Sequence, residues 1–121
     1  SDVPQIYELL LENFDLQADH IPSEDDLLQI VKEKEVMIYK IGDKIECFFI
    51  YRREGKKLYC AFSYNHASAD ILYSIERRVK EIEYEENGIK MHYAWFNAEN
   101  KKALRRNAWK DTKIRDYIFV K

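Results

Sequence analysis

The sequence contains few of the residues that break or cross-link a fold. Its 121 residues include only three glycines, two prolines and two cysteines. So few glycines and prolines, beside nine tyrosines, six phenylalanines and two tryptophans, argue against a disordered chain. Both cysteines, Cys47 and Cys60, lie inside apolar segments. We therefore expect buried, reduced thiols rather than a disulfide or a metal pair.

The sequence also lacks a strong charge of one sign and long apolar runs. Its formal net charge of −2 provides no general attraction to nucleic acid or to an anionic membrane. No apolar run approaches the roughly 20 residues that a membrane-spanning helix needs, and the N-terminus does not resemble a signal peptide. We expect a cytoplasmic protein with no nucleic-acid or membrane partner. Its length fits a single domain over residues 1–121.

Motifs of several enzyme classes are absent. The chain has no Gly-x-x-x-x-Gly-Lys phosphate loop, no Gly-x-Ser-x-Gly turn, and no Cys-x-x-Cys or His-Glu-x-x-His spacing. Its three histidines are scattered, so we expect no metal site. Basic residues cluster over residues 101–115. A solvated helix face is the usual explanation, and contact with RNA, a phosphate or an acidic partner is the less favoured one.

The spacing of apolar residues predicts a succession of helices and strands. Asp2 to Gln5 is typical of a capped helix start, and Ser23 is a second predicted cap. Helices are expected over residues 6–14, 23–31, 71–86 and 97–107. Strands are expected over residues 36–41, 45–51, 58–64, 89–96 and 114–120. Turn residues between the first three strands predict an antiparallel meander.

This order, α-α-β-β-β-α-β-α-β, resembles the GNAT superfamily of acyl-CoA-dependent N-acyltransferases without its usual first strand. Residues 14–23, 42–51 and 116–121 are similar to stretches of some members. Asn97 stands eleven residues before Ala108-Trp109, as an Asn does before a Gly-Phe pair in the family. The resemblance implies an α/β fold with a mixed sheet, in which the meander is followed by a β-α-β unit with parallel central strands.

The missing first strand has a consequence for partners. We expect either a domain cut from a longer protein or a domain whose sheet lacks that strand. An exposed sheet edge favours pairing with another chain. A homodimer, or docking to a neighbouring domain or protein partner, is therefore expected.

The resemblance locates the acetyl-CoA-binding loop at the turn into the long helix. In the family this turn reads Gln/Arg-x-x-Gly-x-Gly/Ala, and its N–H groups hold the pyrophosphate. The matching residues are Tyr64, Asn65, His66, Ala67, Ser68 and Ala69, followed by Asp70. Alanine at both glycine positions adds methyl groups, and Asp70 adds negative charge. Asn65, His66 and Ser68 could still donate hydrogen bonds, although a capped helix that binds no ligand is the favoured interpretation.

The catalytic positions that the resemblance implies are also incomplete. In many members a Tyr seven residues after the Asn protonates the leaving thiolate, but that position here is Leu104, or Asn107 if Asn100 is the anchor. Neither side chain can act as that general acid. The conceivable substitutes are Glu46, Tyr64, Tyr73 and His92, each of which also has a structural interpretation.

Two functions remain open. One is a GNAT-like domain with an eroded loop, which binds acetyl-CoA weakly or not at all and binds a partner instead. The other is an active acyl-CoA-dependent N-acetyltransferase that acts on an unknown amine. The loop composition favours the first, and the frequency of active members in the family favours the second.

Overall fold

The computed structural model describes residues 2–14 and 20–94. Its helices are α1 (Val3–Asn13), α2 (Glu24–Lys32) and α3 (Ala69–Glu81), and α3 runs into a π-helical turn, η1 (Ile82–Glu86). Its strands are β1 (Val36–Ile41), β2 (Lys44–Glu54), β3 (Lys57–Asn65) and β4 (Met91–Ala94). The helix and strand predicted after residue 96, together with Asn97, lie outside the described residues.

The four strands form one mixed sheet in the order β1-β2-β3-β4. β1 pairs antiparallel with β2, and β2 pairs antiparallel with β3, which confirms the predicted meander. After α3 the chain returns to the sheet and β4 lies parallel to β3, with Lys57 opposite Met91 and Cys60 opposite Ala94. The predicted α/β class and the parallel β-α-β unit are therefore confirmed.

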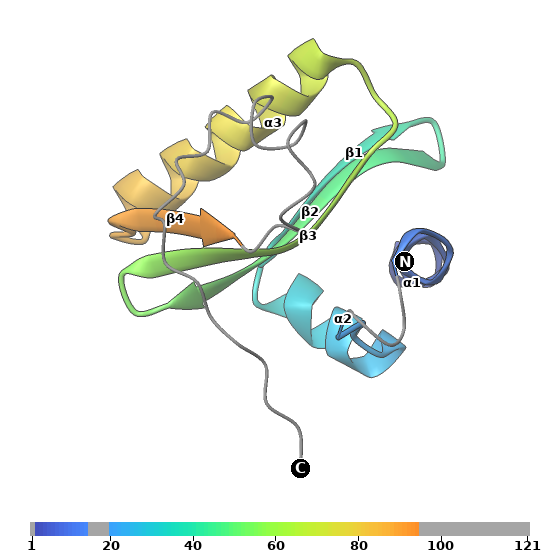
Figure 1. Ribbon diagram of the computed structural model, residues 1–121, viewed down its shortest axis with the longest axis horizontal. Coiled ribbons are helices and arrows are strands. Elements are labelled where there is room, and N and C mark those ends of the chain that lie inside the picture. The colour runs from blue at the N-terminus through green and yellow to red at the C-terminus, as the bar shows by residue number, and fades with distance from the viewer. Residues whose placement is uncertain (1, 15–19, 95–121) are drawn as a thin grey trace, which may run out of the picture.

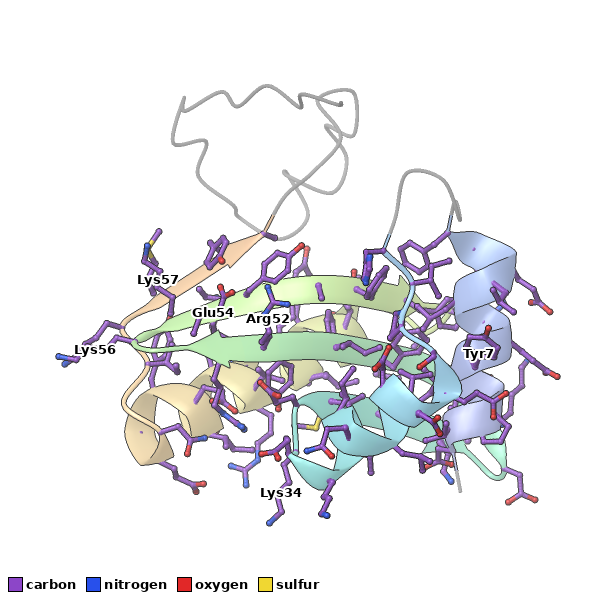
Figure 2. All side chains as sticks on the ribbon, turned by 90° about the horizontal axis from the view of Figure 1, so that it is seen from below. Tyr7, Lys34, Arg52, Glu54, Lys56 and Lys57 are labelled. Carbon is purple, nitrogen blue, oxygen red and sulfur yellow. The ribbon has the colours of Figure 1, made fainter. Side chains whose placement is uncertain are left out.

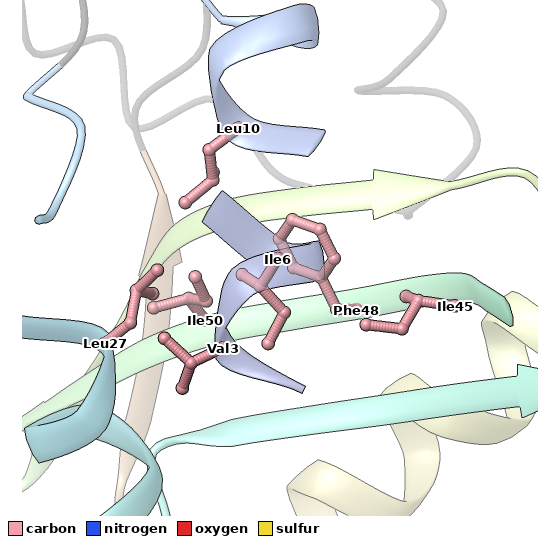
Figure 3. Packing of buried hydrophobic residues seen from close by; sticks show 7 residues of the cluster. All are labelled: Val3, Ile6, Leu10, Leu27, Ile45, Phe48 and Ile50. Carbon is pink, nitrogen blue, oxygen red and sulfur yellow. The ribbon is translucent and has the colours of Figure 1, made fainter. Parts of the chain in front are cut away.

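Helices cover both faces of this sheet. α3 lies on one face, and α1 and α2 lie on the other (Figure 1). The α1/α2-face core consists of Val3, Ile6, Leu10, Leu27, Ile45, Phe48 and Ile50 (Figure 3). The α3-face core consists of Cys47, Phe49, Tyr51, Leu58, Leu72, Val79 and Ile89. Two separate cores are thus built on the same sheet.

β2 contributes to both cores because successive side chains of a strand point to opposite faces. Phe48 and Ile50 enter the α1/α2-face core, whereas Phe49 and Tyr51 enter the α3-face core. A strand buried on both faces has a continuous apolar run rather than an alternating pattern. The segment from Cys47 to Tyr51 has that pattern, and all of its residues are buried.

Two β-bulges interrupt the meander. The first lies in β2 at Glu46, which has no partner in β1. The second lies in β3 at Ala61, which has no partner in β2. The bulge at Glu46 lies close to the end of β3, so it affects the loop that leads into α3.

The helix starts partly follow the local sequence. The Ser23 hydroxyl accepts a hydrogen bond from the Asp26 N–H, and the Asp26 carboxylate accepts one from the Ser23 N–H, both at 3.1 Å. This reciprocal pair confirms the predicted cap of α2. Asp2 stands at the start of α1, but its side chain makes no capping hydrogen bond and pairs instead with Lys40 at 2.9 Å. The predicted helix start is therefore confirmed, with Asp2 at the N-cap position, but the Asp2 side chain does not cap the helix.

The long helix differs from its predicted form. It begins at Ala69, and its last turn is π-helical rather than α-helical. Glu83 lies in that turn and is fully buried, where both of its carboxylate oxygens accept hydrogen bonds from Arg53 at 2.7 Å. π-Helical turns occur mostly as single-turn bulges within α-helices. The wider turn directs Glu83 towards the sheet, which apolar spacing alone does not indicate.

Cys47 and Cys60 are both free thiols, as predicted, and Cys47 is completely buried. Over residues 2–14 and 20–94, none of the helices combines the length and the apolar character that crossing a bilayer requires.

Candidate functional site

The loop between β3 and α3 is the site that the sequence singles out. β3 ends at Asn65 and α3 begins at Ala69. Ser68 is the N-cap of α3, and its hydroxyl accepts a hydrogen bond from the Ile71 N–H at 3.4 Å. The loop therefore ends at the N-terminus of α3, where backbone N–H groups can attract an anion.

Two of the loop N–H groups already have partners inside the protein. The His66 N–H donates to the carbonyl oxygen of Glu46 at 2.6 Å. The Ala67 N–H donates to the side-chain oxygen of Asn65 at 3.0 Å. Within the described part of the chain, the N–H groups of Ser68, Ala69 and Asp70 have no acceptor. Only this shorter set remains available to a ligand.

The side chains of the loop differ in what they contact. Ala67 packs against the α3-face core, so its methyl group contributes to packing. Ala69 and Asp70 are exposed. Asp70 stands in the first turn of α3 and lines a shallow groove between α3 and β1. Its negative charge stabilises the positive end of the helix dipole and opposes the binding of a second anion there.

The structure brings two of the predicted catalytic candidates beside this loop. Tyr64, half-buried at the end of β3, stacks on Phe48 at 5.5 Å and on His66 at 6.4 Å between ring centroids. The Glu46 carbonyl accepts the loop hydrogen bond, and its carboxylate lies 3.8 Å from the Lys44 ammonium. The third candidate, Tyr73, lies on α3 with 40% of its surface exposed. The predicted residues 64–70 and Glu46 thus form one neighbourhood.

His92, the remaining candidate, lies elsewhere, in a small cavity under α3. The cavity is lined by Phe49, Tyr51, Cys60, Glu76, Val79 and His92. Burial, with a smaller contribution from the Lys80 charge, lowers the pKa of His92 to about 4. Burial, with a smaller contribution from the Glu76 charge, raises the pKa of Cys60 to about 12. Both groups are therefore neutral near pH 7, and a protonated thiol is a poor nucleophile.

The sequence gives no indication that Cys60, Glu76 and His92 lie together. They come from β3, α3 and β4, and only the parallel register of the two strands brings them together. The alternation of side chains along each strand indicates which residues share a face of the sheet. It does not give the register between β3 and β4, which decides which of these residues are neighbours. In the residues that the structure describes, no three His, Cys, Asp or Glu side chains gather where they could hold a metal ion.

The comparisons with known proteins give the fold. No protein-family model matches the chain, and no curated protein sequence matches it. Solved structures do match over nearly the whole chain. A probable acetyltransferase superposes with a TM-score of 0.67 at 11% identity, covering 98% of this chain and 91% of that one. The chain therefore shares the fold of this probable acetyltransferase, which confirms the predicted GNAT-like fold.

Two further solved structures share this fold. One is the crystal structure of a predicted acetyltransferase with acetyl-CoA, from Clostridium acetobutylicum. It matches with a TM-score of 0.62 at 13% identity, over 98% of this chain and 90% of that one. TTHA1254 from Thermus thermophilus matches with a TM-score of 0.61 at 16% identity, over 93% of this chain and 92% of that one. At such low identity the likeness shows the fold and nothing about activity.

Proposed function

We propose that this chain is an acetyltransferase-like domain that binds acetyl-CoA weakly or not at all and has little or no acetyl-transfer activity. The observation that carries the proposal is the hydrogen bonding of the loop before α3. The N–H groups of His66 and Ala67 donate to Glu46 and Asn65, at 2.6 and 3.0 Å. A pyrophosphate needs several N–H groups that converge on it, and these two point to protein acceptors.

Charge at the same helix end supports the proposal. Asp70 is the acidic residue in the first turn of α3 and is exposed. A like-charge contact with a bound pyrophosphate in a partly desolvated site costs about 1–3 kcal/mol, which corresponds to about tenfold to a hundredfold in affinity. The methyl group of exposed Ala69 adds bulk next to the free N–H groups. These residues therefore fit the pyrophosphate of acetyl-CoA poorly.

One observation favours the alternative, an active acyl-CoA-dependent N-acetyltransferase. Glu46 and Tyr64 would be the candidates for proton transfer, since both lie beside the loop.

Calorimetric titration of the 121-residue chain with acetyl-CoA tests the proposal. We expect no binding in the micromolar range. The triple variant Ala67→Gly, Ala69→Gly, Asp70→Asn should gain measurable affinity, because it removes the charge and two methyl groups. Adding Asn65→Ala should increase the affinity further, since it releases the Ala67 N–H from its internal acceptor.

The control is Asn13→Ala, which removes an exposed Asn that donates to the Leu9 carbonyl in α1, away from the loop. It should leave acetyl-CoA binding unchanged. Thermal unfolding of each variant checks that the fold is retained. Micromolar binding by the unmodified chain, with turnover of an amine acceptor, would contradict the proposal and favour the active enzyme.

A further inference from the structure

Arg53 of β2 joins the ends of two helices that cover opposite faces of the sheet. Its guanidinium donates four hydrogen bonds. Two go to the Glu83 carboxylate in η1, both at 2.7 Å. The other two go to the carbonyl oxygens of Glu33 and Lys34, directly after α2, both at 3.0 Å. Because η1 continues α3, one side chain connects the end of α2 to the end of the helix on the other face.

The turn after α2 has the hydrogen bonds of a Schellman motif. The Glu35 N–H donates to the Ile30 carbonyl at 3.0 Å, and the Lys34 N–H donates to the Val31 carbonyl at 3.1 Å. In this motif the residue after the C-cap is left-handed and is usually glycine. Here that residue is Lys34, with φ of 56°. A residue with a Cβ atom disfavours this conformation, so the turn depends on contacts that hold it.

Those contacts are made by β2 and not by the Lys34 side chain. That side chain is exposed, and Figure 2 shows it below the sheet at the end of α2. The Lys34 carbonyl accepts hydrogen bonds from Arg53 and, at 3.2 Å, from the Tyr51 hydroxyl. The Glu35 carboxylate accepts one from the backbone N–H of Arg53 at 2.7 Å. Arg53 is therefore the main partner of the turn.

Glu83 in turn positions Arg53. A bidentate carboxylate fixes the plane of a guanidinium, and this carboxylate is 0% exposed. The Glu83 backbone carbonyl also accepts from the N–H groups of Asn87 and Ile89, at 3.2 and 3.0 Å, which closes the end of η1. The same residue thus closes η1 through its backbone and orients Arg53 through its side chain.

We propose that the pair of Arg53 and Glu83 couples the two helix ends, so that the turn after α2 and η1 open together rather than independently. The left-handed turn needs Arg53, and Arg53 needs Glu83 to hold its orientation. A change at either end should therefore release the other end, through a chain of contacts between named residues. Local opening of this kind is measured by amide hydrogen exchange.

Hydrogen exchange of the 121-residue chain, followed at single amides by NMR, tests the coupling from the η1 side. Glu83→Gln keeps the size of the side chain and removes its charge. It should speed the exchange of the Lys34 and Glu35 amides about fivefold or more. The Leu27 amide, which donates to the Ser23 carbonyl at the other end of α2, should change less. Glu86→Gln, at an exposed residue of η1, is the matched control and should leave these amides unchanged.

The reciprocal experiment starts from the α2 side. Lys34→Val places a β-branched residue in the left-handed conformation, which disfavours the turn. It should speed the exchange of the Asn87 and Ile89 amides of η1 about fivefold or more. Lys34→Gly is the control, because glycine adopts this conformation freely, and it should not speed them. Both variants should fold because the Lys34 side chain is exposed, which thermal unfolding checks.

Two results would overturn the proposal. Faster exchange confined to the helix end that carries the substitution would show that the two ends open independently. An equal increase at Leu27 and at the coupled amides would show a loss of overall stability instead of a joint local opening. Neither experiment uses acetyl-CoA, so the outcome is independent of the proposed function.

Discussion

The two faces of the sheet are stabilised by different means. The α1/α2-face core consists only of aliphatic side chains and one phenylalanine, and Ile6, Leu10 and Phe48 are completely buried in it. On the α3 face the buried and half-buried groups include thiols, a phenol, an imidazole and a carboxylate. One strand, β2, thus separates an apolar core from one that contains titratable groups.

The difference indicates how each face responds to change. Apolar burial is non-directional and independent of pH, so the α1/α2 face should be sensitive mainly to lost volume. Buried titratable groups must stay neutral or be paired, so the α3 face should also be sensitive to pH and to lost partners. Burial raises the pKa of Cys47 to about 11 and that of Tyr51 to about 12, which keeps both neutral. Three predictions test this contrast.

The largest effect is expected on the α1/α2 face. Phe48→Ala removes a fully buried ring and leaves a cavity, which should lower the free energy of unfolding by about 3–5 kcal/mol. Leu28→Ala, at a residue 53% exposed on α2, is the control and should cost less than about 0.5 kcal/mol. Urea unfolding between pH 5 and pH 8 measures both. A Phe48→Ala loss that varies strongly with pH would contradict the contrast between the faces.

A smaller effect is expected at the ion pair of the α3 face. Arg53→Met leaves the Glu83 carboxylate, 0% exposed, without its main partner, although Asn87 still donates to it at 3.1 Å. Breaking this pair should lower the free energy of unfolding by about 2–3 kcal/mol, less than for a fully buried pair because Arg53 is 28% exposed. The double variant Arg53→Met, Glu83→Leu should recover most of the loss, since no unpaired charge remains. Additive losses in urea unfolding would show that the pair is not coupled.

The smallest effect is the pH dependence that His92 confers. Burial lowers the pKa of His92 to about 4 in the folded protein, below the ordinary value of 6.5. Between these two pH values the unfolded chain binds the proton and the folded chain does not, so stability falls as the pH is lowered from 6.5 to 4. We expect a loss of about 1–2 kcal/mol, reduced because His92 is only half-buried.

His92→Gln should remove this slope, whereas replacement of the exposed His20 by Gln should leave it unchanged. Urea unfolding at half-unit pH steps measures it. Hydrogen bonds, chiefly from Ser23 and from Tyr93, lower the pKa values of Asp26 and Glu54 respectively. The stability that these two carboxylates add is therefore lost only as the pH falls below the ordinary carboxylate pKa values. An identical slope in wild type and His92→Gln between pH 6.5 and 4 would contradict the prediction.

Periodicity in the sequence determined the elements and their order. The predicted first strand, 36–41, matches β1 residue for residue, and the next two strands are extended by one to three residues at their ends. β-Branched and aromatic runs separated by glycine turns specify a meander through local interactions alone. Gly42 and Gly55 confirm the turns, with φ of +60° and +62°, a conformation that glycine adopts without strain. Ser23 and Ser68 likewise act as caps because their partners lie three residues away.

Contacts between distant segments were decided only by the tertiary structure. The loop before α3 was located from the sequence, but the hydrogen bond from the His66 N–H to Glu46 was not, because it depends on a bulge twenty residues earlier. The ion pair of Arg53 with Glu83 joins a strand to a π-helical turn thirty residues later. The local spacing of apolar residues indicates which face of a helix or strand a side chain occupies. Strand register, bulges and helix pitch determine which other side chain it contacts on that face.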